Sequence, residues 1–178
     1  MANEAKGTVT VTVPSPEEAT PPVRFVGKYS AKVAASTNQV TLPKAFKNAV
    51  EAGKEGMLML VPRDDVPYWQ LYTRNSFLQL VEDIRIDPKL QENNVGEELA
   101  EEIAVSAMPV EYDTQGRFVL SKDFTSKLGA EKNEVLFTGG ITHLKLWTEA
   151  DYNAEQEKSQ AMKQSDAYKA AKKAALRR

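Results

Sequence analysis

The sequence predicts an α+β fold, mainly β, in which one β-hairpin-plus-helix unit is used twice. Residues 39–46 are repeated at residues 117–124, 78 positions later, with leucine, lysine and phenylalanine in the same places. In each copy strand-like runs follow, and then a polar stretch of helical character. Two copies are too few for a solenoid. We therefore expect two halves related by a pseudo-two-fold axis in a small barrel-like domain with peripheral helices.

The first half is expected to run from a strand through a helix to a hairpin. Residues 23–33 are strand-like, and a helix then begins at Pro43. Proline is tolerated there because its missing N–H has no helical partner in the first turn. Gly53 is expected to end this helix, and residues 57–61 and 68–72 are expected to be strands around a turn.

Helices are expected to connect the two halves and to close the chain. An apolar stripe at i, i+3, i+4 and i+7 predicts an amphipathic helix at Phe77, Leu80, Val81 and Ile84. Asp87-Pro88 is a helix-entry signal. It precedes a second apolar stripe at Leu99, Ile103 and Ala107. From Glu149 onward, Ala, Lys, Gln and Glu dominate, which predicts a solvated helix that frays toward Arg178.

We divide the chain accordingly into five segments. The N-terminal segment alternates strictly at residues 8–13, as a strand at a sheet edge would, but prolines follow and disorder is the favoured interpretation. The segments are a disordered tail (1–22), the first half (23–81), a helical connection (82–107), the second half (108–153) and a charged C-terminal helix or tail (154–178).

Composition excludes several classes of function. The chain of 178 residues has no cysteine, which removes disulfides, thiolate zinc sites and cysteine nucleophiles. It has one histidine, His143, and lacks the motifs that would make this residue a catalytic base or a metal ligand. The sequence therefore predicts neither an enzyme nor a bound cofactor.

Charge is distributed unevenly along the chain. The net charge is −2, so the protein is not a nucleic-acid binder of overall basic character. Acidic residues dominate from 82 to 102, and basic residues dominate from 158 to 178. The basic end is either a solubilising helical face or a non-specific contact to DNA.

The five residues 113–117, Asp-Thr-Gln-Gly-Arg, form the most informative motif. Gly116 supplies a tight-turn conformation that other residues adopt only at a cost. In one interpretation Asp113 pairs with Arg117, or caps nearby amides, and stabilises the turn. In the other, Arg117 faces a DNA phosphate or a guanine edge, where its planar guanidinium can donate two parallel hydrogen bonds. The two interpretations are compatible.

This motif and the segments after it resemble the MraZ family of bacterial regulators, whose halves are of the AbrB/SpoVT swapped-hairpin type. The resemblance covers about residues 23–153. In the second half it continues through a helical run to Leu128-Gly129, the segment 134–140 and a closing strand at 144–147. The family resemblance implies two AbrB/SpoVT-like halves.

The first half departs from the family's pattern in its turn. The strand-then-proline signature is kept up to Pro43. In the turn, however, Ala35, Asn38 and Gln39 replace the family's aspartate, glycine and arginine. As the sequence stands, only the second of the two turns is intact.

The resemblance implies that Arg117 is the main DNA contact and that Asp113 orients it. Lys122 and Lys44 occupy equivalent repeat positions after the hairpins and are implied as phosphate contacts. Solvated surface lysines are the alternative for both. Gln39 cannot neutralise a phosphate, although its amide can make a bidentate contact to an adenine edge.

By resemblance, the function is that of a DNA-binding transcriptional regulator near the promoter of a cell-division and cell-wall gene cluster. The implied partners are double-stranded DNA with direct repeats and further copies of the chain in a ring. Neither a membrane nor a small-molecule substrate is expected. The implied location is the cytoplasm, in association with the nucleoid. A second hypothesis, favoured by Ala35 and Gln39, is a non-DNA-binding oligomeric scaffold, a divergent paralogue on the same fold.

Overall fold

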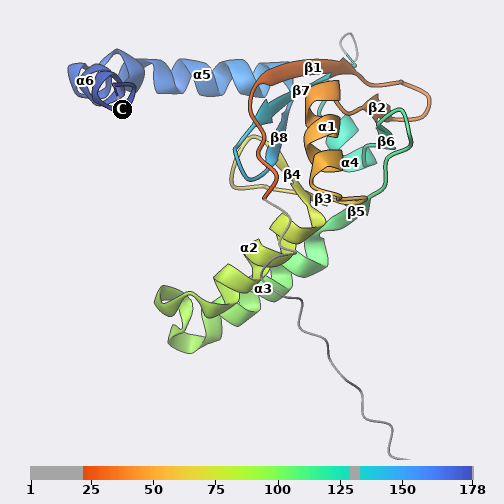
Figure 1. Ribbon diagram of the computed structural model, residues 1–178, viewed down its shortest axis with the longest axis horizontal. Coiled ribbons are helices and arrows are strands. Elements are labelled where there is room, and N and C mark those ends of the chain that lie inside the picture. The colour runs from red at the N-terminus through yellow and green to blue at the C-terminus, as the bar shows by residue number, and fades with distance from the viewer. Residues whose placement is uncertain (1–21, 129–132, 178) are drawn as a thin grey trace, which may run out of the picture.

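The computed structural model describes residues 22–128 and 133–177 (Figure 1). The tail expected to be disordered lies, apart from Pro22, outside the described residues. The strands are β1 (Lys28–Lys32), β2 (Gln39–Thr41), β3 (Leu58–Val61), β4 (Trp69–Thr73), β5 (Met108–Val110), β6 (Arg117–Val119), β7 (Glu134–Gly139) and β8 (Leu144–Trp147). The α-helices are α1 (Lys44–Ala52), α2 (Arg74–Ile86), α3 (Val95–Ser106), α4 (Lys122–Thr125), α5 (Glu149–Gln164) and α6 (Asp166–Ala175).

Six strands form one antiparallel sheet in the order β1-β7-β8-β4-β3-β5, and β2 and β6 form a separate two-stranded ribbon. Many of these pairings join the two predicted halves. β1 pairs with β7, β5 pairs with β3, and β4 pairs with β8. The large sheet is open, with β1 and β5 as its edges, so the described residues form no closed barrel.

The core lies where the sheet, the ribbon and the two short helices meet. Phe46 of α1 and Phe124 of α4 are 1% and 2% exposed. Phe118 of β6 contacts Phe137 of β7 edge to face, with ring centres 6.4 Å apart. Six aromatic side chains from both halves are buried: Phe25, Phe46, Phe124, Phe137, Trp69 and Trp147. This packing fixes the ribbon against the rest of the molecule.

Local signals account for most helix ends. α1 begins directly after Pro43 and ends at Gly53, as predicted. Thr73 is the last residue of β4, Thr148 directly follows β8, and each caps the next helix. The Thr73 hydroxyl accepts from the Ser76 amide, and that of Thr148 accepts from the Asp151 amide. Such caps satisfy amides that a helix start leaves free.

Three expectations need correction. The helix expected to run to Leu128-Gly129 is one turn long, because after Ser126 the chain tightens into i→i+3 bonds from Lys127 to Phe124 and from Leu128 to Thr125. Asp87-Pro88 begins a 3-10 turn, Pro88–Leu90, and α3 begins only at Val95. The description "mainly β" is wrong, since the α-helices contain more residues than the strands.

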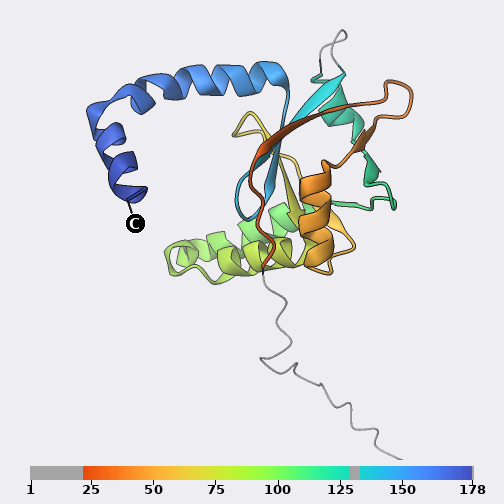
Figure 2. The same ribbon diagram turned by 45° about the horizontal axis from the view of Figure 1, so that its top comes forward.

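Two helical arms leave the body at separate places and extend toward the same side of it in both views (Figures 1 and 2). α2 and α3 pack as a hairpin around Phe77, with Leu80, Val81 and Ile103 half-buried beside it. α5 and α6 form the second arm and contain no buried residue. Among the described helices, none is long and apolar enough to cross a membrane.

Candidate nucleic-acid interface

The ribbon of β2 and β6 has one buried face and one exposed face. Val40 pairs with Phe118 at its centre, and both side chains are buried. Because side chains alternate along a strand, the residues on either side of this pair point the other way. The exposed face therefore carries Gln39, Thr41, Arg117 and Val119. A two-stranded ribbon of this kind is one of the elements that the DNA major groove admits.

Asp113 holds Arg117 through both its backbone and its side chain. One carboxylate oxygen of Asp113 accepts from the amides of Gln115 and Arg117, each at 2.9 Å. The other accepts from Nε of Arg117 at 2.7 Å, and Nη2 lies at the same distance. These hydrogen bonds lower the pKa of the Asp113 carboxyl, and the bond from the Arg117 amide has the largest effect. The structural interpretation of the motif is thus confirmed.

The same geometry leaves part of the guanidinium free for a ligand. Arginine has five N–H donors, of which Asp113 engages one on Nε and one on Nη2. Within the described part of the chain, Nη1 has no hydrogen-bond partner. The Arg117 side chain is 44% exposed. An oriented, exposed donor pair is therefore available above the ribbon.

Gly116 allows the turn to close against α1. Its φ is +81°, and a Cβ at this position would lie 3.0 Å from Cδ of Lys47. Its amide donates to the carbonyl of Asp113 at 2.8 Å, and the Asp113 amide donates to the carbonyl of Arg117 at 3.0 Å. The predicted need for glycine is confirmed by the backbone conformation and is increased by the close approach of the lysine.

The first turn has a related backbone but is one residue longer. The carbonyl of Gln39 accepts from the amide of Ala34, whereas the carbonyl of Arg117 accepts from Asp113 four positions earlier. The residue placed like Asp113 is therefore Ala34, not Ala35 as the ungapped alignment has it. Asn38 has a φ of +54° and so keeps the left-handed conformation of Gly116. The turn shape is retained without the carboxylate or the guanidinium.

Each predicted lysine lies next to the turn of the other half. Lys44 follows Leu42 by two residues, and the Leu42 amide donates to the carbonyl of Gly116 at 2.8 Å. The equivalent bond, from Leu120 to the carbonyl of Asn38, is 2.9 Å long and brings Lys122 near the first turn. Both lysines are exposed. The structure thus groups Lys44 with Arg117, and Lys122 with Gln39.

Sequence reasoning missed three residues of this surface. Thr41 and Val119 are exposed beside Arg117 and Gln39, and the two-residue alternation around Val40 and Phe118 could have identified them. Lys47 is half-buried against Gly116 and forms an ion pair of 2.8 Å with Glu51. No local sequence signal connects Lys47 with a turn about 70 residues later.

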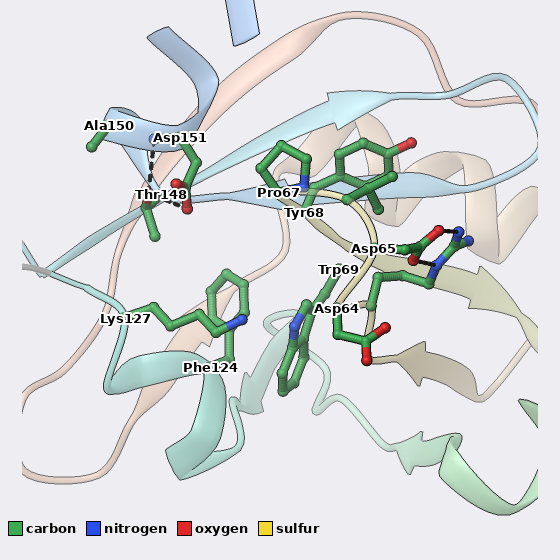
Figure 3. Close-up of a pocket in the computed structure, with 12 residues that line it drawn as sticks. Asp64, Asp65, Pro67, Tyr68, Trp69, Phe124, Lys127, Thr148, Ala150 and Asp151 are labelled. Atoms are coloured by element: carbon green, nitrogen blue, oxygen red, sulfur yellow. Dashed lines mark hydrogen bonds and ion pairs between the residues drawn. The ribbon is translucent and has the colours of Figure 1, made fainter. Parts of the chain in front are cut away.

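A pocket of about 540 Å³ lies between the β3–β4 loop, α4 and the start of α5 (Figure 3). Trp69 and Phe124 line it with ring centres 5.2 Å apart, and Nζ of Lys127 lies 5.4 Å from the Trp69 ring. The indole N–H of Trp69 is buried without a hydrogen-bond partner among the described residues. The pocket contains none of the predicted site residues.

His143 belongs to a polar chain rather than to a catalytic site. Nη1 of Arg63 donates to Oε1 of Gln70 at 2.9 Å, so the Gln70 amide nitrogen is directed to Nε2 of His143, 3.1 Å away. Nε2 must accept, which requires neutral imidazole. Burial, with Lys145 and Arg63 nearby, lowers the pKa of His143 to about 4. The described residues hold no cluster of three or more side chains suited to a metal ion.

Comparison with known proteins gives two results. Residues 103–175 match a family model described as "MraZ protein, putative antitoxin-like". The chain is also similar to proteins named transcriptional regulator MraZ from Burkholderia cenocepacia (strain HI2424) and Burkholderia orbicola (strain MC0-3). Each is 26% identical over 150 residues, covering 79% of this chain and 94% of the relative.

The two results support each other. The family model covers the second half from the end of α3 and continues into α6. The relatives align along nearly their whole length, so the similarity also includes the first half. The predicted resemblance to the MraZ family is confirmed.

Proposed function

We propose that the protein is a DNA-binding transcriptional regulator that contacts the duplex through the exposed face of the β2–β6 ribbon. The observation that carries the proposal is Arg117, which Asp113 holds in one orientation while Nη1 has no partner among the described residues. Preorganised arginine suits a guanine edge or a phosphate because two parallel N–H donors match the acceptors. The relatives' name, transcriptional regulator, agrees with this assignment.

We also propose that the two halves, 23–81 and 108–153, are related by a pseudo-two-fold axis, with 82–107 as the connection and 154–178 as the closing segment. Two pairings support this. Val40 pairs with Phe118, its counterpart in the repeat, and Gln70 pairs with Lys145, its counterpart after a shift of three residues. Replacing each strand of the large sheet by its counterpart also reverses the strand order onto itself. The exposed ribbon face would then carry two related DNA-contacting clusters, one beside each turn, which we call heads.

The two heads differ in their affinity for DNA. The second head combines Asp113 and Arg117 with Lys44, which supplies a phosphate contact at its side. In the first head Gln39 and Lys122 occupy these places, so only the lysine carries charge. A glutamine amide can read an adenine edge but adds nothing to counterion release. Binding is accordingly asymmetric, with the second head dominant.

Assembly into an oligomer compensates for the weak DNA affinity of a single chain. A net charge of −2 gives no general attraction to DNA. A ring of several copies presents several heads, and once one head is bound the others act at high effective concentration on neighbouring direct repeats. The target we propose is a promoter of a cell-division and cell-wall gene cluster, bound in the cytoplasm at the nucleoid.

Fluorescence anisotropy with the duplex upstream of the protein's own gene tests this function. We expect tighter binding to that duplex than to a scrambled duplex of equal length. The affinity should fall with salt, with a slope of about 0.9 in log units for each phosphate contacted. Equal, weak or absent binding to both duplexes by an assembled protein would instead support the oligomeric scaffold.

A further inference from the structure

The C-terminal helix α6 is folded, but the described residues offer it no surface other than α5. It contains no buried residue, and α5 is the element against which it packs. An isolated helix of about ten residues is only marginally stable in water, so the amphipathic pattern of α6 indicates a surface to pack on. Ser165 separates it from α5 and caps it by accepting from the Tyr168 amide at 3.2 Å.

α6 has a basic face and an apolar face. Lys169, Lys172 and Lys173 follow the i, i+3, i+4 spacing and so share one side of the helix. Between them and beside them lie alanines and Tyr168, whose side chain is partly exposed. In the described part of the chain, none of the three lysines takes part in an ion pair. Their charge is available to a partner.

The outer face of α3 carries the opposite charge. Glu98, Glu101 and Glu102 are exposed and make no ion pair with the described residues. Glu97 reaches only Arg85, at 3.9 Å. Val105, seven residues after Glu98 and on the same side, is 87% exposed. This face therefore carries exposed carboxylates whose charge is opposite to that of the basic face of α6.

We propose that α6 of one copy binds the outer face of α3 of a second copy. This inference rests on the homo-oligomer of the proposed function and names its contact. At 1.5 Å per residue both helices are roughly 15–18 Å long, so their charged stripes match in length. The three lysines pair with the exposed carboxylates of α3. Individual exposed pairs are weak, so the set of pairs orients the contact and makes it sensitive to salt.

The arrangement of the arms favours a contact between copies. α5 carries α6 away from the body, and in Figure 1 the two arms leave the body at separate places. The β2–β6 ribbon lies on the other side of the body from α6 in both views, which leaves the DNA heads free (Figures 1 and 2). Each copy supplies both faces, so the contact is head-to-tail and generates a ring where the rotation closes.

Sedimentation velocity of the full chain without DNA tests the contact by charge exchange. We expect Lys169→Glu/Lys172→Glu/Lys173→Glu to weaken assembly at least tenfold, and Glu98→Lys/Glu101→Lys/Glu102→Lys to do the same. Mixing the two variants should restore association, because the α6 of each variant is then complementary in charge to the α3 of the other. Lys158→Glu/Lys163→Glu on α5 is the control and should assemble as the unchanged protein does. Circular dichroism verifies that each variant keeps its helices.

Several results would overturn the inference. Variants that assemble normally, or a mixture that stays dissociated, would exclude the contact. A sedimentation coefficient of monomer size at every concentration would exclude the contact between copies. Normal assembly with weakened DNA binding would assign the basic face to DNA instead. Failure here leaves the DNA function intact, because anisotropy of the Arg117 head is measured separately.

Discussion

The turns at the two ends of the β2–β6 ribbon share a backbone path and differ in the groups they display. Both contain one left-handed residue, Gly116 or Asn38, and both accept an amide from the opposite half. Only the second turn has a carboxylate that orients an arginine. The comparison teaches that the shape of the turn depends on backbone bonds, while the chemistry of the head depends on two side chains that the first turn lacks.

The largest expected effect is a difference in DNA affinity between variants of the two heads. Arg117→Ala should reduce specific DNA affinity by about 100-fold or more, because a bidentate arginine contact contributes about 1–3 kcal/mol and the loss recurs at each head. Gln39→Ala should cost less than about threefold, since an amide releases no counterions. Anisotropy in one buffer measures both.

Arg117→Lys serves as the matched control, because it keeps the charge without the planar donor pair. It should retain the salt slope while losing the preference for the native duplex. Equal losses in Arg117→Ala and Gln39→Ala would show that the heads contribute equally. A large fall in thermal stability of Arg117→Ala would mean that the residue acts mainly in holding the turn.

A smaller effect is expected from building the missing head. Ala34→Asp/Gln39→Arg places a carboxylate and a guanidinium where the backbone bonds align the first turn with the second. We expect affinity to rise about tenfold and the salt slope to steepen by about one unit for each head that gains a phosphate contact. Gln39→Arg alone should give a smaller gain, because nothing orients the new arginine. No gain in either variant would show that the first turn faces away from the duplex.

The left-handed residue in each turn contributes modestly to the free energy of unfolding. Gly116→Ala should lower the free energy of unfolding by about 1–2 kcal/mol, because alanine is strained at positive φ and its Cβ meets Lys47. Asn38→Ala should lower it by about 1 kcal/mol, while Asn38→Gly should change it by less than about 0.5 kcal/mol. Urea unfolding at neutral pH compares the three variants. An equal loss in Asn38→Gly and Asn38→Ala would implicate the asparagine side chain instead.

Much of the fold and of the second turn could be predicted from the sequence, because the signals for these features are local. The repeat indicated strands in both halves, and proline and glycine marked the ends of α1. The ion pair of Asp113 and Arg117 is also local, because the two residues are four positions apart in one turn.

The remainder depends on contacts between distant segments. The extra residue in the first turn is visible only from the bond between Ala34 and Gln39, since the matched segments begin after the turn. Lys44 joins the Arg117 head through a bond between halves, and no spacing within either half reveals that. The length of α4 depended on whether its last residues continued i→i+4 bonds or tightened, which helix propensity alone does not decide.

The smallest expected effect is a pH response confined to the second turn. The pKa of Asp113 is lowered by bonds from Arg117 and Gln115, so these bonds contribute stability above the unfolded pKa and lose it as pH falls through the folded pKa. Amide resonances of Gln115 and Arg117 should therefore shift with a midpoint below the usual aspartate value of about 3.9. Those of Thr37 and Asn38 should not follow, because backbone carbonyls bind them. Asp113→Asn should remove the pH dependence of these resonances. A midpoint at the usual aspartate value would show that Arg117 does not hold the Asp113 carboxylate.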